Sequence, residues 1–368
     1  MSVLAVAIHP VTRPGRGRWG RAATTAALAV TLCLGTAFTG LSPARADITA
    51  TTTVAVGRAP VGVALTPDGS QAYVPNQGSG SVSVITVATG QVSRTIGVGN
   101  YPSSVAISPN GALAYVTNVG DDAVSVITTA TGAVSATIPV GLFPVGVAFS
   151  PNGAQAYVTN LFDDSVSVIA VATGTAGKSI KLPEGSSPIG VAFSPNGTQA
   201  YVTNLFTRSV SVINVATRKV SKTIKVGNTP VAVAFTPDST KAYVTNVRNR
   251  SVSVITVATG TVSSTLVVGY LPSAVAISPD GAQAYVTNLG DNTVSVVAVA
   301  TGAVTNTLTV GNSPSAVAVS PNGKKVYVPN ADDGSVSVIS VLSSESVTPP
   351  VSTPPLPVGS PRRPTGSG

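Results

Sequence analysis

A four-residue segment, Tyr-Val-Thr-Asn or Tyr-Val-Pro-Asn, recurs seven times along this chain of 368 residues. Successive copies lie 42 residues apart, except for one interval of 44. A fixed period of this length is the signature of a repeat architecture, in which each unit buries its apolar surface against its neighbours. The pattern predicts seven copies of one supersecondary unit, and its invariant tyrosines are expected in the core: Tyr73, Tyr115, Tyr157, Tyr201, Tyr243, Tyr285 and Tyr327.

Each unit contains four short apolar segments, alternating or β-branched, and each segment is bounded by a turn signal. In the unit of residues 102–141, Ser-Pro-Asn-Gly at 108–111 suits a type I hairpin turn, and Ala-Thr-Gly at 130–132 supplies the next turn. The 3.6-residue periodicity of stacked helical repeats is missing. Four antiparallel strands in about 42 residues describe one blade of a β-propeller.

The two ends of the array predict a closed ring. The seventh repeat stops after its third strand at residues 335–339, and the missing fourth strand occurs at the front, where residues 53–57 match residues 95–99. An N-terminal strand that completes the last blade removes the exposed sheet edges. The sequence therefore predicts an all-β, closed seven-bladed propeller over residues 47–342, folding as a monomeric ring.

Residues 1–46 have the features of a secretory signal peptide. A start with four arginines and no acid precedes the apolar residues 22–41, and Ala44-Arg45-Ala46 fits a small-x-small cleavage site. An uncleaved membrane anchor is the alternative, since the apolar stretch is just long enough to span. No later apolar run approaches the roughly 20 residues needed to cross a bilayer. The expected location is extracellular or associated with the cell wall.

Residues 343–368 form a different segment. They hold seven Pro and six Ser among 26 residues, which is typical of a disordered or extended tail.

Signal cleavage narrows the available chemistry. His9, Cys33, Trp19 and Met1 are the only residues of their types, and all four precede residue 47. Their loss excludes disulfides, His or Cys metal sites, axial haem ligation and Ser-His-Asp or Cys-His catalysis within the mature chain. Without the five arginines of this segment, 16 Lys and Arg face 13 Asp and Glu, a net charge of +3. We therefore expect no catalytic residue, metal or cofactor, and only a weak attraction to polyanions.

The tetrads, the Ser-Pro-Asp/Asn-Gly turns and the Ala-Thr-Gly turns resemble the YVTN family of β-propeller repeats over residues 48–342. That family occurs in secreted and cell-surface bacterial proteins and is similar to archaeal surface-layer proteins. It belongs to a wider group of seven-bladed propellers that includes enzyme domains. The resemblance implies the fold, whereas one fold hosts many activities.

A few positions depart from the repeat. Residues 173–188 carry a two-residue insertion, and Arg218 replaces the Gly of one Ala-Thr-Gly turn, at a cost of roughly 1 kcal/mol if that position needs a positive φ. Pro75 and Pro329 replace the tetrad Thr, and we expect them at strand ends because a mid-strand Pro loses a ladder hydrogen bond.

The turns of nearly constant sequence should share one face of the ring, and the loops after each tetrad and between blades should share the other. These loops vary, and loops on a rigid scaffold usually carry binding. Acids follow the tetrads of blades two, three, six and seven, and bases follow those of blades four and five. The candidate ligand-binding residues on this face are Tyr101, Phe143, Phe162, Phe206, Tyr270, Asp121, Asp163, Arg248 and Arg250.

Structural explanations compete at each position. Paired Asp residues are common solvated turn formers, a calcium site needs a spaced acidic motif that is missing here, and the aromatics can seal blade junctions. The main functional hypothesis is a non-catalytic scaffold that binds an envelope protein or polysaccharide. A lactonase- or lyase-like enzyme is the second hypothesis. Polyanion binding through blades four and five is the third, with nucleic acid disfavoured as the partner because the basic residues spread over both faces.

Overall fold

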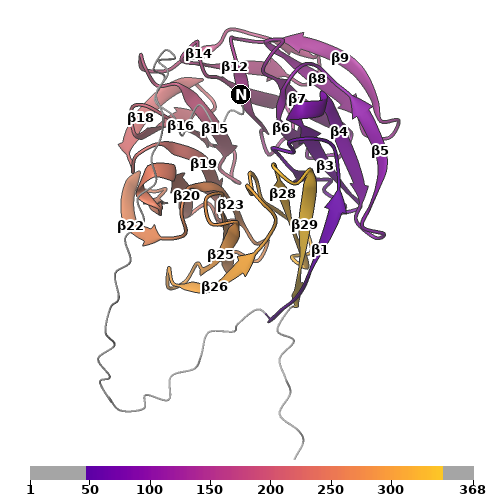
Figure 1. Ribbon diagram of the computed structural model, residues 1–368. Coiled ribbons are helices and arrows are strands. Elements are labelled where there is room, and N and C mark those ends of the chain that lie inside the picture. Colours follow the sequence, from indigo (N-terminus) through magenta and orange to yellow (C-terminus); the bar gives the residue numbers. More distant parts are fainter. Residues whose placement is uncertain (1–46, 343–368) are drawn as a thin grey trace, which may run out of the picture.

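The computed structural model describes residues 47–342, which form seven antiparallel sheets arranged as the blades of a closed ring (Figure 1). The predicted all-β, seven-bladed propeller is confirmed. The predicted signal peptide and tail, residues 1–46 and 343–368, lie outside the described residues. Each blade is numbered by its tetrad.

The first strand of each blade lies next to the central axis, where it contacts the first strands of the neighbouring blades. These inner strands are β2 (Ala64–Leu65), β6 (Pro102–Ile107), β10 (Pro144–Phe149), β15 (Pro188–Phe193), β19 (Pro230–Phe235), β23 (Pro272–Ile277) and β27 (Ala318–Val319). The second strands end on the tetrads and are β3 (Gln71–Asn76), β7 (Leu113–Asn118), β11 (Gln155–Asn160), β16 (Gln199–Asn204), β20 (Lys241–Asn246), β24 (Gln283–Asn288) and β28 (Lys325–Asn330).

The third strands carry the Ser-Val-Ser-Val pattern and are β4 (Ser81–Thr86), β8 (Ala123–Thr128), β12 (Ser165–Ala170), β17 (Ser209–Asn214), β21 (Ser251–Thr256), β25 (Thr293–Ala298) and β29 (Ser335–Leu342). The outer strands are β5 (Gln91–Gly97), β9 (Ala133–Pro139), β13 (Thr175–Ala176) with β14 (Ile180–Lys181), β18 (Lys219–Lys225), β22 (Thr261–Val267), β26 (Val304–Thr309) and β1 (Asp47–Ala55). Two 3-10 turns, η1 (Gln77–Ser79) and η2 (Val247–Asn249), follow the tetrads of blades 1 and 5.

Strand β1 closes the ring by pairing with β29, and Figure 1 shows the indigo first strand beside the yellow last one. Thr53 lies opposite Ser337, as Thr95 lies opposite Ser83 in blade 1. The displaced strand therefore takes the register of an ordinary outer strand, as the sequence predicts.

The core lies between the blades, because alternate residues of a strand point to opposite faces of its sheet. In β11, Tyr157 packs into the cluster shared with blade 4, and Val158 packs into the cluster shared with blade 2. All seven tetrad tyrosines are at most 1% exposed, which confirms their core assignment. Three of them pack at a tilt against a Phe at the end of the next inner strand; Tyr157 and Phe193, for example, have ring centroids 4.6 Å apart.

The tetrad Asn is buried and fixes the second strand to the third. Asn160 Nδ2 donates to Ser165 Oγ and to Ser167 Oγ, both at 2.9 Å, and each of the other blades repeats this bond to the serine seven residues on. The serines of the third strands thus serve as hydrogen-bonding partners as well as small residues at the blade interfaces.

The departures from the repeat have local structural consequences. Pro75 and Pro329 are the penultimate residues of β3 and β28, close to the strand ends where they were expected. The inner strands beside them, β2 and β27, shrink to two residues each, whereas the other inner strands have six. In blade 3, Gly177 interrupts the outer strand between β13 and β14. Arg218 has φ 54°, so its turn does require the left-handed region.

Candidate functional site

The inner strands surround a cavity of about 190 Å³ on the central axis, to which all seven blades contribute. Three aliphatic residues, Val145, Ile189 and Val231, form its wall in blades 3 to 5. Ser103, Ser273 and Ser315 take the equivalent positions in blades 2, 6 and 7. Blade 1 contributes Val61 at this position and also Gln77. None of the described residues that line this cavity is charged.

The apolar side of the channel continues onto the face that holds the loops after the tetrads and the loops between blades, called here the variable face. Leu161, Leu205 and Val247, which directly follow the tetrads of blades 3 to 5, are buried with the aliphatic wall in one cluster. Phe143 and Leu271 pack on its edge. The channel is therefore aliphatic over blades 3 to 5 and mainly polar over the other four blades, where Val61 also lines it.

The backbones of the two loop types are hydrogen-bonded to each other, which fixes the variable face. In blade 2, the amide of Val119 donates to the carbonyl of Tyr101 at 3.2 Å, and the amide of Gly120 donates to that of Asn100 at 3.1 Å. The first bond recurs in every blade, and the second recurs in every blade except blade 4. Side chains on these loops are therefore held on a rigid support.

The candidate acids Asp121 and Asp163 hold this backbone in place. Asp121 Oδ2 accepts from the Asn100 amide at 2.7 Å, and Asp163 Oδ2 accepts from the Leu142 amide at 2.7 Å. In six blades, the side chain three residues after the tetrad accepts this bond from a backbone amide. Ser79 Oγ and Asn249 Oδ1 are the acceptors in two of these blades. These carboxylates thus cap the loops that enter their own blades.

The next residue along reaches the following blade. Asp122 Oδ1 accepts from the Phe143 amide at 2.7 Å, Asp164 Oδ1 from the Ser187 amide at 2.7 Å, and Asn292 Oδ1 from the Ser313 amide at 2.9 Å. This position has a positive φ in all seven blades, as do the seven residues that precede the inner-strand prolines. The second acid of the pairs in blades 2 and 3, and Asn292 in blade 6, thus bind the entry of the following blade.

Four of the five candidate aromatics are exposed on the variable face. Tyr101 is 56% exposed, Phe162 63%, Phe206 59% and Tyr270 47%. Phe143 is half-buried, because its ring lies against Phe162 with the centroids 4.7 Å apart. Tyr101, Phe162 and Phe206 occupy blades 2, 3 and 4, and the half-exposed Leu142 lies at the entry to blade 3. Tyr101, Leu142, Phe162 and Phe206 together are called here the aromatic arc.

The candidate arginines Arg248 and Arg250 lie exposed in and after η2, on blade 5 beside the arc. The Arg250 guanidinium lies 5.6 Å from the centroid of the Tyr270 ring, within the range of a cation–π contact. Arg208 takes the equivalent of the Arg250 position in blade 4 and is also exposed. The structure thus places basic side chains at one end of the aromatic arc.

Gln77 is a channel residue that the sequence reasoning missed. The corresponding residue is apolar in every other blade, and that contrast was the available signal.

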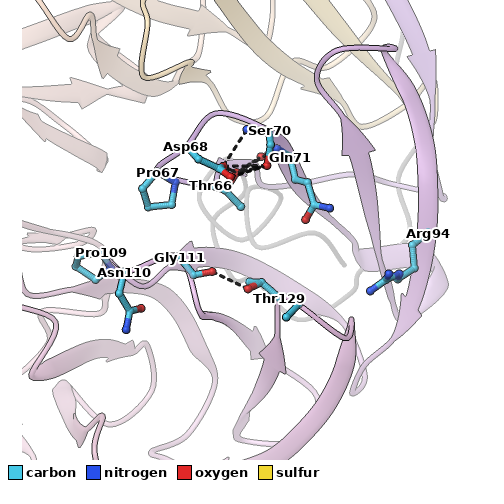
Figure 2. Close-up of a pocket in the computed structure, with 11 residues that line it drawn as sticks. Thr66, Pro67, Asp68, Ser70, Gln71, Arg94, Pro109, Asn110, Gly111 and Thr129 are labelled. Atoms are coloured by element: carbon cyan, nitrogen blue, oxygen red, sulfur yellow. Dashed lines mark hydrogen bonds between the residues drawn. The ribbon is translucent and has the colours of Figure 1, made fainter.

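The opposite face, built from the constant turns, holds a larger cavity of about 400 Å³ between blades 1 and 2 (Figure 2). Asp68 there accepts from Thr66 Oγ1 at 2.6 Å and from Ser70, while Arg94 lies apart from it on β5. These hydrogen bonds, led by the one from Thr66, lower the pKa of Asp68. The carboxylate is therefore part of the turn itself.

Two further features concern residues 47–342. Within this range, no three His, Cys, Asp or Glu side chains are grouped closely enough to ligate a metal ion. The same range contains no helix with the length and apolar character needed to cross a membrane.

Comparison with known proteins places the fold in a family. One solved structure, titled hydrazine synthase from Kuenenia stuttgartiensis, superposes with a TM-score of 0.71 at 26% identity, over 77% of this chain and 95% of that one. No curated protein sequence matches the chain. The family described as "Lactonase, 7-bladed beta-propeller" matches residues 146–361, which is more than half of the 368 residues. The chain belongs to the lactonase family of seven-bladed β-propellers.

Proposed function

We propose that this protein is a non-catalytic binding propeller of the cell envelope, which docks a protein partner on its variable face. The aromatic arc carries this proposal. Interface centres are enriched in Tyr, Phe and Arg, and clustered apolar side chains on a rigid surface mark interaction sites. The sequence features of an exported chain and the YVTN-type repeats support an envelope location.

A protein fits the arc better than a polysaccharide does. Sugar binding needs polar side chains beside the aromatic rings, but Asp121 and Asp163 are already bonded to backbone amides. The exposed Arg208 and Arg250 at one end of the arc would pair with acidic residues of the partner. We therefore expect a partner with an apolar patch that is flanked by carboxylates.

Co-sedimentation of the purified chain with isolated envelopes, titrated with salt, tests this proposal. The key variant is Tyr101→Ser/Phe162→Ser/Phe206→Ser. Serine occupies the Tyr101 position in blades 4 and 7, where Ser187 and Ser313 adopt the same positive φ. We expect wild-type retention that survives high salt and is lost in this variant. A matched change on an outer strand, Val262→Ser, controls for the loss of exposed apolar area. Equal retention of both variants would contradict the assigned face.

Lactone hydrolysis is the second candidate, and the family match favours it. The test is a panel of lactones monitored for acid release, with Asp121→Asn and Asp163→Asn as variants. Asn249 already makes the equivalent backbone bond in blade 5, so both variants should fold. Hydrolysis that disappears in either variant would establish an enzyme and overturn the non-catalytic assignment.

A further inference from the structure

Two buried polar side chains at the central channel have no hydrogen-bond partner within residues 47–342. We propose that the channel cavity binds a small neutral amide, which hydrogen-bonds Gln77 and Ser103 and packs against the aliphatic wall of blades 3 to 5. This site is separate from the aromatic arc and does not depend on the proposed docking function.

Gln77 is 7% exposed and lines the cavity from the start of η1. Its backbone amide donates to the Ala59 carbonyl at 2.9 Å, but no described group bonds its carboxamide. The carboxamide lines the channel, where it is available to hydrogen-bond a ligand. The other six blades have apolar residues at this position, which could not do so: Val119, Leu161, Leu205, Val247, Leu289 and Ala331.

The serines of the channel divide into bonded and unbonded groups. Ser273 Oγ donates to the Pro314 carbonyl at 2.8 Å, and Ser315 Oγ donates to the Pro60 carbonyl at 2.9 Å. Ser103 is 8% exposed, and within the described residues its hydroxyl has no such partner. The unbonded groups therefore lie together on blades 1 and 2. Val145 lies beside them on blade 3, and Ile189 and Val231 lie farther round the ring on blades 4 and 5.

The chemistry of the lining selects the ligand class. A charged ligand would be desolvated without a counter-charge, because the described lining is uncharged. A carboxamide presents a donor and an acceptor side by side, so its best complement is another amide, whereas an ester can only accept. A dry cavity of about 150 Å³ can hold benzene, and the cavity of about 190 Å³ suits a slightly larger ring. A lactam with an aliphatic ring combines these properties.

Ligand-observed NMR titration of the whole chain with ε-caprolactam is the direct test. For about eight non-hydrogen atoms we expect a dissociation constant near a millimolar. The matched probes are ε-caprolactone, which cannot donate, and hexanoate, which is charged. We expect the lactone to bind several-fold more weakly than the lactam and hexanoate not to compete.

The variants use residues that the repeat already accommodates. Gln77→Leu installs the residue of blades 3, 4 and 6 and should weaken lactam binding about tenfold, and Ser103→Ala should weaken it about threefold. Gln155→Leu makes the same change on the opposite face, where blade 2 has Leu113, and should leave affinity unchanged. Thermal unfolding of each variant verifies the fold.

Three outcomes would contradict the proposed lactam site. The first is no lactam binding at tens of millimolar, and the second is an affinity that Gln77→Leu and Ser103→Ala leave unchanged. The third is competition of hexanoate with the lactam. The Tyr101→Ser/Phe162→Ser/Phe206→Ser variant should bind the lactam normally, so failure of the docking function and failure of this site are separate results.

Discussion

Asp122 in the loop of blade 2 accepts a hydrogen bond from the backbone amide of Phe143, the residue that opens blade 3, at 2.7 Å. The bond joins residues 21 positions apart across a blade boundary. An acid on the variable face therefore links two neighbouring blades through a hydrogen bond to the backbone.

Replacing Asp122 with Ala should destabilise the ring by about 1–2 kcal/mol, because the Phe143 amide loses its acceptor and Ala is disfavoured at φ 49°. Asp122→Asn should be nearly neutral, since Asn292 makes the same bond to Ser313. Asp122→Gly, which loses the bond but relieves the backbone strain, should fall between the two. Urea denaturation measures all three, and equal stability of the Ala and Asn variants would contradict the role of the bond.

Val54 is the apolar residue of β1 that completes the cluster between blades 7 and 1. Val54→Asp should lower the free energy of unfolding by at least about 3 kcal/mol, because it buries an unpaired charge and loosens the closing strand. Val54→Ile, which copies Ile96, should stabilise by up to about 1 kcal/mol. Chemical denaturation and limited proteolysis report both effects, and tolerance of Asp would mean that β1 is dispensable.

Arg218 has φ 54° where five other blades place a Gly at φ 59–72°. Arg218→Gly should stabilise by about 0.5–1 kcal/mol, because relief of backbone strain exceeds the extra entropy that Gly gives the unfolded chain. Arg218→Ala is the control that removes the same side chain and keeps the strain. Thermal unfolding should rank Gly above both Arg and Ala.

Burial raises the pKa of every tetrad tyrosine, and to about 12 for Tyr201 and Tyr285. The folded state therefore keeps its phenol protons at a pH where the unfolded chain loses them. The contribution of these groups to stability should be complete below pH 10. For Tyr201 and Tyr285 it should be lost between pH 10 and about 12, by up to about 1.4 kcal/mol per pH unit for each of the two. Denaturation at stepped pH, followed by tyrosinate absorbance, checks this. The exposed Tyr101 and Tyr270 lie outside this expectation, but ionisation of all nine tyrosines at pH 10 before unfolding would contradict it.

The architecture was predictable because the same strand and turn signals occur in all seven repeats. Each tetrad marks a second strand, and the match of residues 53–57 to residues 95–99 indicates the closing strand. The shortened β2 and β27 were harder to foresee. They depend on how Pro75 and Pro329 affect a neighbouring strand, whereas a sequence pattern indicates only what a proline does to the strand that contains it.

The candidate site was predictable in part. Loop position alone indicates exposure for Tyr101, Phe162, Phe206 and Tyr270. Phe143 is half-buried because its ring packs against that of Phe162. A sequence pattern does not reveal such a contact between two separate loops. The structural role of the acids was equally hard to predict, because the backbone amides that they bind lie 21 residues away in the sequence.

The pairing of β1 with β29 has a consequence for how the ring can be cut. Asp47 lies opposite Leu342, so a link of about two to four residues would join them as an ordinary hairpin. New termini could then be opened at any Ala-Thr-Gly turn, which joins a third strand to its outer strand. In each permutant the outer strand would come first in the chain and would pair with the third strand at the other end. Circular permutants of residues 47–342 should therefore fold to the same ring, and the position at which the polypeptide starts becomes a free choice for displaying a fused domain.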